Sequence, residues 1–234
     1  MSAPSSWYHR HRFPPAIISH AVSLYYRFAV SYRDVEEMLA LRGIVVSYET
    51  MRRWSIKFGP RFAAEIRRRR PHPRDHWHLE EMYLRIGGRT WYLWRAVDAD
   101  GMVLDIVLQA RRNQEAAETL LGRLVAGQPT APRVIVTDKL ASYIPAIKRV
   151  FPQTEHRAHK GLNNCAENSH QPTRQRERAR RRFKSPAHTQ RFLEPFGPIR
   201  QHFCPGRHLL PAADYHAVMA VRRATWDELC GVAA

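Results

Sequence analysis

The sequence has few cysteines and no long hydrophobic run. Its three cysteines, Cys165, Cys204 and Cys230, are widely spaced and form no C-x-x-C pair. This usage argues against a disulfide framework and fits a reducing compartment. No apolar stretch approaches the ~20 residues that a membrane-spanning helix needs. Residues 1–10 contain no apolar segment of the kind found in signal peptides. We therefore expect a cytoplasmic protein with no membrane partner.

Acidic residues are scarce relative to basic ones. The 234 residues include 38 Lys and Arg against 21 Asp and Glu, which gives a net charge of +17. Hydrophobic residues still make up 44%, so the chain has enough apolar material for a packed core and is not a disordered basic tail. The excess positive charge predicts a polyanionic partner, with nucleic acid the leading candidate. Charge alone does not distinguish a DNA enzyme from a ribosomal or chromatin protein.

Residues 14–60 have the pattern of three short helices. Pro14-Pro15 opens the first helix, a capping box that begins at Ser31 opens the second, and Ser47 caps the third. Gly59-Pro60 is expected to end the third helix. Three helices with a tight turn before the last match a helix-turn-helix, although an ordinary helical hairpin gives the same pattern.

A dense basic stretch extends from the third helix to residue 74. Its nine basic residues, set against the single acid Glu65, are Arg52, Arg53, Lys57, Arg61, Arg67, Arg68, Arg69, Arg70 and Arg74. Such a run is often only a solvated helix face. Here it follows a candidate recognition helix, where phosphate contacts would position the protein on a duplex. Pro71-His72-Pro73 is expected to stop the helix and mark a domain boundary.

Beyond this boundary the pattern changes to strands. Three segments rich in aromatic and β-branched residues, separated by Gly and Asp turns, predict an antiparallel meander over residues 77–86, 90–98 and 102–109. The expected elements that follow are a helix over 113–126, a buried strand over 133–137, a helix near 140–149, a strand near 153–156 and a helix from Asn163 or Asn164. The order β-β-β-α-β-α-β-α defines an α/β fold.

The C-terminal third contains a second basic stretch. Residues 171–184 hold seven basic residues and one acid, Glu177. Because such dense like charge repels itself without an anionic partner, we favour DNA binding over a merely solvated helix. His202, Cys204 and His208 superficially suggest zinc, but no second ligand pair completes a tetrahedral set. A final helix is expected over residues 212–229.

Three acids stand out in the α/β region. Asp138 follows the apolar run 134–136, at the carboxyl end of a buried strand, where ligands tend to bind in open α/β sheets. Glu80 lies within the first strand, and Glu167 lies on the late helix expected to pack across the sheet. Acids in such places resist burial without a metal or a base nearby. The spacing leaves two interpretations open, an acidic metal site and separate salt-bridged acids.

Several ordered motifs point to a known family. They are Phe13-Pro-Pro, Tyr32–Met38, Ser47–Trp54, Trp77–Glu81, Tyr92–Asp98, Thr137-Asp-Lys139, Glu155-His156, Gly161–Asn164, Glu167 and Arg182–Ser185. The chain resembles bacterial insertion-sequence transposases that have a DDE catalytic core of the ribonuclease H and retroviral-integrase fold. More narrowly, it resembles the sixth insertion-sequence family, known for replicative cointegrate formation. The likeness covers about residues 13–226.

The resemblance implies a fold and an activity. The fold would be a helix-turn-helix followed by a ribonuclease H-like core. The activity would be metal-dependent hydrolysis of a phosphodiester at a transposon end, followed by attack of the freed 3′-hydroxyl on target DNA, with no covalent enzyme intermediate. By position, the catalytic and metal-binding acids are Glu80, Asp138 and Glu167, with Mg²⁺ or Mn²⁺ as cofactor. Partners would be double-stranded DNA, both terminal inverted repeats and target, and at least one further copy of the chain. The place of action would be the bacterial nucleoid.

The chain departs from the family pattern at its first acid. The family has aspartate where this sequence has Glu80, and strand alternation turns the neighbouring Glu81 to the opposite face. One added methylene displaces the carboxylate and adds a rotatable bond, and misplacement of about 1 Å can cost about a hundredfold in rate. Our hypothesis is that fold and DNA binding survive while catalysis is weak or lost. The alternative function is then a transposase relic that only binds DNA.

The remaining predictions concern DNA contacts, domain boundaries and helix packing. The residues expected to contact DNA are Ser47, Tyr48, Thr50, Arg52, Arg53, Lys57, Lys139, Lys160, Arg174, Arg178, Arg181, Arg182 and Lys184. The expected domains are an N-terminal arm (1–13), a helix-turn-helix (14–60), a basic helix with linker (61–75), a catalytic domain (76–200) and a helical tail (201–234). On the helices, the apolar side chains of Met38, Tyr48, Val125 and Val221 are among those expected to pack inward.

Overall fold

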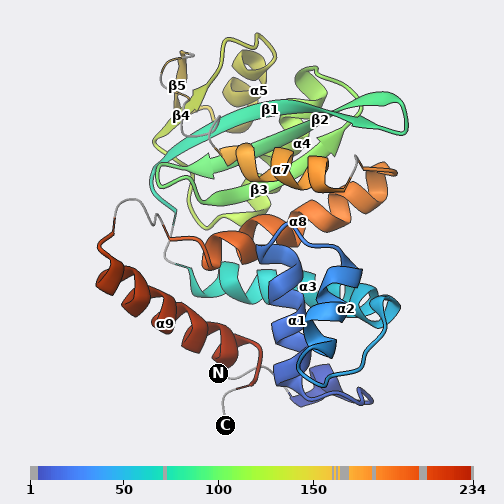
Figure 1. Cartoon of the computed structure of the whole chain (residues 1–234). Coiled ribbons are helices and arrows are strands. Elements are labelled where there is room, and N and C mark those ends of the chain that lie inside the picture. The colour runs from blue at the N-terminus through green and yellow to red at the C-terminus, as the bar shows by residue number, and fades with distance from the viewer. Residues whose placement is uncertain are drawn as a thin grey trace. The chain divides into compact units, whose positions relative to one another are not determined.

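The chain forms two compact units. A computed structural model describes residues 5–70, 73–159, 161, 163, 169–180, 183–205 and 210–232, apart from the side chains of residues 5 and 6 (Figure 1). One unit consists of Met1–Arg70 together with Glu194–Ala234, and the other of Pro71–Leu193. None of the described helices is long and apolar enough to cross a membrane. The expected division into five segments stays a prediction.

The first unit is helical. Its elements are a short 3₁₀ helix η1 (Ser5–Tyr8), α1 (Pro15–Arg27), α2 (Tyr32–Ala40), α3 (Tyr48–Arg69), the second half of α8 (Pro186–His202) and α9 (Ala212–Leu229). The Ser31 hydroxyl accepts from Asp34 N, and Ser31 N donates back to the Asp34 carboxylate, so the predicted capping box is present. Ser47 Oγ accepts from Thr50 N at 3.3 Å and caps α3 as expected. Whether α1–α3 act as a helix-turn-helix stays a prediction.

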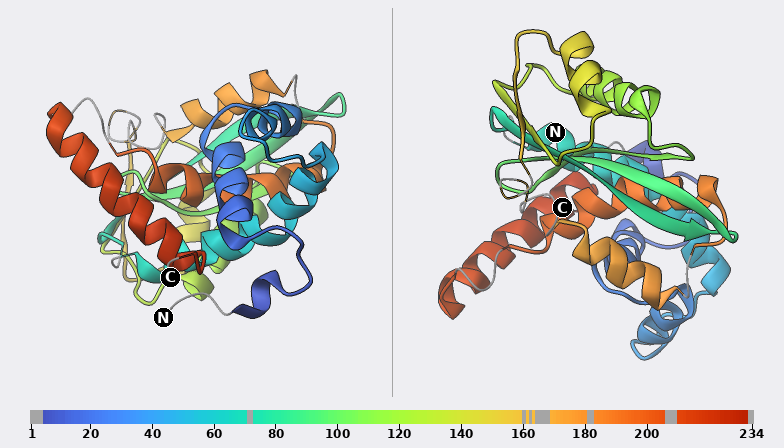
Figure 2. Two further views of the ribbon diagram at one scale, coloured as in Figure 1. Left: turned by 60° about the horizontal axis from the view of Figure 1, so that its bottom comes forward. Right: turned by 90° about the horizontal axis from the view of Figure 1, so that it is seen from above.

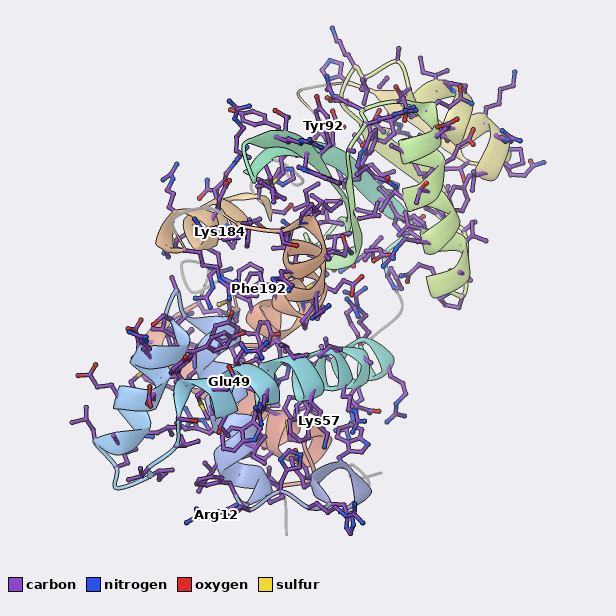
Figure 3. The ribbon with its side chains drawn as sticks, turned by 90° about the vertical axis from the view of Figure 1, so that its right-hand side faces the viewer. Arg12, Glu49, Lys57, Tyr92, Lys184 and Phe192 are labelled. Atoms are coloured by element: carbon purple, nitrogen blue, oxygen red, sulfur yellow. The ribbon has the colours of Figure 1, made fainter. Side chains whose placement is uncertain are left out.

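The predicted end of α3 at Gly59-Pro60 is wrong. The helix continues to Arg69, and Figure 3 labels Glu49 and Lys57 in its first half. Phe58 and Phe62 are fully buried, with ring centroids 5.8 Å apart, so packing on both sides of the proline outweighs the hydrogen bond that Pro60 cannot donate. Gly59 does not end the helix; it allows the Tyr26 side chain to pack closely against α3. A Cβ there would lie 2.7 Å from the Tyr26 hydroxyl oxygen.

The second unit contains a mixed five-stranded sheet. Its strands are β1 (His76–Ile86), β2 (Arg89–Asp98), β3 (Val103–Gln109), β4 (Val134–Thr137) and β5 (Glu155–Ala158). Their order is β3-β2-β1-β4-β5, in which β1 pairs antiparallel with β2 and parallel with β4. The α/β class, the antiparallel meander and the predicted element order through β5 are confirmed. The arrangement fits a ribonuclease H-like core.

Helices lie on both faces of this sheet. On one face are α4 (Gln114–Gly127) and α5 (Tyr143–Val150), and on the other lies α7 (Gln171–Ala179), as Figure 2 shows. The main core lies under α4 and α5, where Trp77, Leu79 and Trp94 from the sheet meet Leu120 and Tyr143. Asn113 Oδ1 accepts from Ala116 N at 3.1 Å and caps α4, as the sequence predicted.

Several helix positions differ from expectation. Met38, Tyr48, Val125 and Val221 are exposed, so their predicted inward packing is wrong. Leu39 and Leu124, the residues next to Met38 and Val125, are buried as expected, so these two exposed side chains lie just beyond the edge of the buried stripe of their helix. Of the two starts expected for the late helix, Asn163 is described and is not helical, whereas Asn164 lies outside the described residues; α7 begins at Gln171.

Candidate active site

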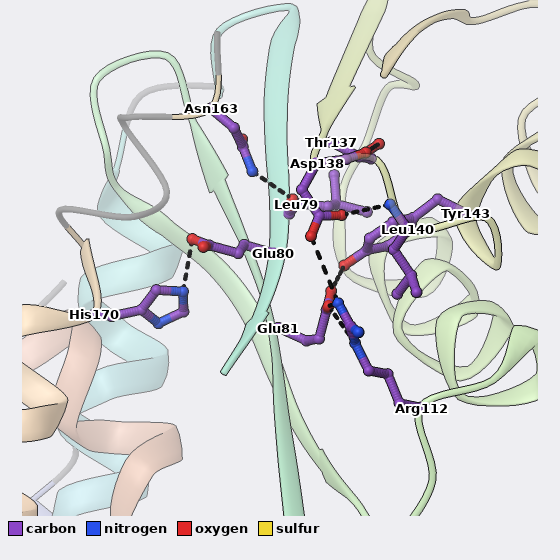
Figure 4. A network of polar contacts seen from close by, with 10 residues as sticks. All are labelled: Leu79, Glu80, Glu81, Arg112, Thr137, Asp138, Leu140, Tyr143, Asn163 and His170. Carbon is purple, nitrogen blue, oxygen red and sulfur yellow. Dashed lines mark hydrogen bonds and ion pairs between the residues drawn. The ribbon is translucent and has the colours of Figure 1, made fainter. Parts of the chain in front are cut away.

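The candidate site begins at consecutive acids on β1. Successive side chains of a strand point to opposite faces, so Glu80 faces the α7 side and Glu81 faces the α4–α5 side (Figure 4). In the parallel pairing of β1 with β4, Leu79 is opposite Thr137. Glu80 follows Leu79 on β1, and Asp138 follows Thr137, the last residue of β4. The β1–β4 pairing therefore places the backbones of these predicted acids side by side, but their side chains have different neighbours. Glu80 contacts His170 on the α7 side, whereas Asp138 lies beside Arg112, which pairs with Glu81 (Figure 4).

Glu80 makes a close contact with the chain that enters α7. Its Oε2 lies 2.8 Å from His170 Nε2, and its side chain is 16% exposed. Directly opposite Glu80 on β2 is the buried Arg95, whose Nη1 donates to the carbonyl oxygen of Ser169 at 2.5 Å. Two cross-strand neighbours thus both contact residues 169–170, which immediately precede α7.

A third contact lies on the other side of the undescribed segment. Asn163 is buried, and its Nδ2 donates to the backbone oxygen of Leu79 at 3.0 Å. The described residues before and after 164–168 therefore contact adjacent positions of β1 and its neighbour β2. Glu167 itself lies outside the described residues, as does Lys160.

Asp138 follows the last residue of β4, as predicted. Its Oδ1 accepts from Leu140 N at 3.0 Å, which fixes the turn that leads toward α5. Its Oδ2 lies 3.7 Å from a terminal nitrogen of Arg112, and the side chain is 29% exposed. The adjacent Thr137 hydroxyl contacts His156 Nε2 at 2.9 Å, and burial lowers the pKa of this histidine.

Glu81 is held in a separate buried network. Arg112 Nε donates to its Oε1 at 2.7 Å, the Tyr143 hydroxyl donates to its Oε2 at 3.1 Å, and the side chain is only 2% exposed. Burial raises the pKa of Glu81, and the hydrogen bond from Arg112 opposes this shift. Burial beside Glu81 also raises the pKa of Tyr143 well above its ordinary value. Because partners occupy both oxygens, Glu81 is a poor replacement for Glu80.

Among the described residues, no three His, Cys, Asp or Glu side chains gather closely enough to hold a metal. Two of the three predicted acids are described and the third is not, so the proposed triad stays a prediction. The sequence reasoning missed Arg112, Tyr143 and His170. Their signals were weak. Arg112 immediately precedes the α4 cap, and His170 follows Glu167 by three residues.

The predicted DNA contacts are spread over both units. On α3, Arg52 and Arg53 both pair with Glu49, and exposed Lys57 Nζ lies 2.7 Å from His11 Nε2. In the second unit, Arg174 pairs with Glu177 and its guanidinium lies over the Tyr83 ring. Exposed basic side chains there include Lys139, Arg178 and Lys184, while Arg181 and Arg182 lie outside the described residues. The DNA-binding role of these residues stays a prediction.

Sequence comparisons identify the class. The model of a DDE-domain family matches residues 74–204. The transposase for insertion sequence element IS257 in transposon Tn4003 from Staphylococcus aureus is 33% identical over 164 residues, 68% of this chain and 73% of the relative. The transposase for insertion sequence-like element IS431mec of Staphylococcus aureus strain Mu50 is 32% identical over 164 residues, with the same coverage.

The chain belongs to the family of DDE transposases of insertion sequences, which confirms the resemblance. Part of the chain also aligns with a solved structure, the cryo-EM intasome of simian T-cell lymphotropic virus in complex with PP2A regulatory subunit B56 gamma. It has 19% identity and a TM-score of 0.35, and the match covers 43% of this chain and 39% of that one.

Proposed function

We propose that this protein is a DNA transposase that binds terminal inverted repeats of its element and joins their 3′-hydroxyl ends to target DNA. The observation that carries the proposal is the parallel pairing of β1 with β4, which brings the backbone of Glu80 on β1 close to Asp138, one residue past the end of β4, within a chain of the DDE transposase family. Duplex DNA is the substrate, and a synapse of two ends requires at least two copies of the chain. The site of action is the nucleoid of a bacterial cytoplasm.

The acids suit a divalent cation. Glu80 and Asp138 are partly exposed carboxylates, and carboxylate oxygens are the ligands that Mg²⁺ and Mn²⁺ prefer. We assign Glu167 as the third ligand by the family pattern. A bound cation would supply Lewis-acid polarisation of a phosphate oxygen and activation of the attacking hydroxyl. The chain itself orients Asp138 through Leu140 N and Glu80 through His170.

DNA binding is assigned to two basic surfaces. The α3 surface comprises Ser47, Tyr48, Thr50, Arg52, Arg53 and Lys57, and it would read the inverted repeat. The α7 surface comprises Arg174, Arg178 and Lys184, with Arg181 and Arg182 outside the described residues. Together with Lys139 and Lys160, it would hold the phosphate backbone. Phosphate contacts of this kind position a protein on DNA, while base contacts select the sequence.

A second candidate function is a catalytically impaired DNA-binding protein. Its support is the contact between His170 and Glu80, because a glutamate already engaged by an imidazole and longer by one methylene is a less suitable metal ligand than the family's aspartate. A protein of this kind would occupy transposon ends without joining them.

One experiment separates the two functions. The purified chain is incubated with oligonucleotides that carry its element's terminal repeats and with a supercoiled target, in Mg²⁺ and in Mn²⁺. Joined products that depend on Asp138, shown by their loss in Asp138→Asn, support the transposase. Retained binding to the repeats with no joined product supports the DNA-binding alternative. Absence of repeat binding would overturn both.

A further inference from the structure

Arg112 lies between a buried acid, Glu81, and a partly exposed acid, Asp138. It occupies the loop before α4, where its Nε is 2.7 Å from Glu81 Oε1 and a terminal nitrogen makes a second contact with the same oxygen (Figure 4). The same terminal nitrogen lies 3.7 Å from Asp138 Oδ2. One guanidinium therefore contacts a buried acid closely and a candidate metal ligand loosely.

Burial explains why Glu81 holds the guanidinium. The Glu81 side chain is 2% exposed and cannot be solvated by water, so it depends on Arg112 and on the Tyr143 hydroxyl for compensation. Asp138 is 29% exposed and also accepts a backbone hydrogen bond from Leu140. Of the two acids, Glu81 gains more from a close cation.

We propose that Glu81 is a positioning residue that holds Arg112 away from Asp138 and so leaves an Asp138 oxygen available for a divalent cation. This inference rests on the proposed metal site. Without the Glu81 charge, Arg112 would shorten its 3.7 Å contact with Asp138 into a direct charge-assisted pair. A cation would then have to displace a fixed positive charge from its own ligand.

The substitution Glu81→Gln tests this role because it removes the charge while keeping shape and an acceptor for the Tyr143 hydroxyl. We expect Mn²⁺ to bind about fivefold more weakly, the change that one partly exposed ion pair would produce. The double variant Glu81→Gln/Arg112→Gln removes the competing guanidinium as well. Its Mn²⁺ affinity should return to the wild-type value or exceed it.

The rescue distinguishes positioning from a purely structural role. If Glu81 only stabilised the fold, the double variant would lack the same ion pair and would bind Mn²⁺ no better than the single variant. Arg112→Gln alone provides a second test that does not depend on folding of Glu81→Gln. It should bind Mn²⁺ at least as tightly as the wild type.

The measurement is a Mn²⁺ titration of the full chain followed by electron paramagnetic resonance, with circular dichroism as the check of folding. Asp138→Asn is the arm that tests the metal site itself. If Mn²⁺ binding is absent in the wild type or unchanged in Asp138→Asn, the proposed metal site fails, and this assignment fails with it. If Asp138→Asn loses Mn²⁺ binding while Glu81→Gln matches the wild type, only the Glu81 assignment is overturned. Weaker binding in Arg112→Gln would also overturn it.

Discussion

His170 Nε2 lies 2.8 Å from Glu80 Oε2, so the residue that precedes α7 contacts the acid that we predict to stand in place of the family's first aspartate. An aspartate at this position would place its carboxylate about 1 Å or more closer to β1. The longer side chain allows the Glu80 carboxylate to contact His170. For the same reason its oxygens lie farther from β1 than those of an aspartate would. The contact with His170 is therefore one way in which the added methylene of Glu80 would weaken catalysis.

We expect Glu80→Asp to raise strand-transfer activity by about a hundredfold, because it withdraws the carboxylate from His170 and restores the geometry of a short metal ligand. The measurement is the rate of joined product from oligonucleotides bearing the element's repeats. Glu80→Gln should be inactive, and Asp138→Asn controls for contaminating nuclease. Equal, robust activity in wild type and Glu80→Asp would contradict the hypothesis that Glu80 impairs catalysis.

Much of the fold follows from local sequence. The caps at Ser31, Ser47 and Asn113 form as predicted because each satisfies backbone N–H groups within its own first turn. The β meander likewise follows from segments rich in aromatic and β-branched residues and from the Gly and Asp turns between them. The end of α3 was not predictable in this way, because Gly59 is explained by the approach of Tyr26, a residue from another helix.

The site was only partly predictable. Alternation along β1 separates Glu80 from Glu81, and the carboxyl end of β4 locates Asp138, so their positions follow from strand geometry. The partners of these acids come from elements distant in sequence. Arg112 is 31 residues from Glu81, and His170 is 90 residues from Glu80. Only the packed structure shows which acid each of them contacts.

Gly59→Ala should destabilise the protein by about 1–3 kcal/mol, the usual cost of overpacking. The new Cβ would lie 2.7 Å from the Tyr26 hydroxyl oxygen, and the buried Tyr26 hydroxyl donates to Ser55 O, which restrains any movement. The matched control is Gly122→Ala in α4, where no atom lies within 4 Å of the new Cβ. It should stabilise by about 0.5–1 kcal/mol.

Urea unfolding of the two glycine variants measures both changes against the wild type. Opposite signs are the expected result. An equal gain at both positions would show that helix propensity, and not the approach of Tyr26, governs position 59.

Glu49 should make the stability of the first unit depend on pH in acid. Hydrogen bonds from Arg52 and then Arg53 lower the pKa of Glu49 to about 2. A carboxyl group with a lowered pKa in the fold contributes stability above its unfolded pKa and loses it as pH falls through the folded pKa. The contribution is therefore complete above about pH 5 and declines toward about pH 2.

The measurement for Glu49 is the difference in melting temperature between wild type and Glu49→Gln. This difference should shrink from about pH 6 to about pH 3, and about 1 M salt at pH 6 should also reduce it, because the pair is exposed and screened. A difference that is unaffected by both pH and salt would rule out an ionic contribution from Glu49.

DNA affinity should fall steeply with salt, and the α7 surface should account for a defined part of that slope. Arg178 and Lys184 are exposed, and each phosphate contact contributes about 0.9 to the slope of log affinity against log salt. Arg178→Gln/Lys184→Gln should therefore reduce the slope by about 2.

The control is Lys148→Gln, exposed on α5 and outside both basic stretches, which should leave the slope unchanged. Fluorescence anisotropy with a labelled duplex measures all three proteins. A flat wild-type slope would remove the electrostatic basis of the proposal. A loss of about 1 in the control, which removes one charge where the double variant removes two, would mean that net charge, and not the α7 surface, sets DNA affinity.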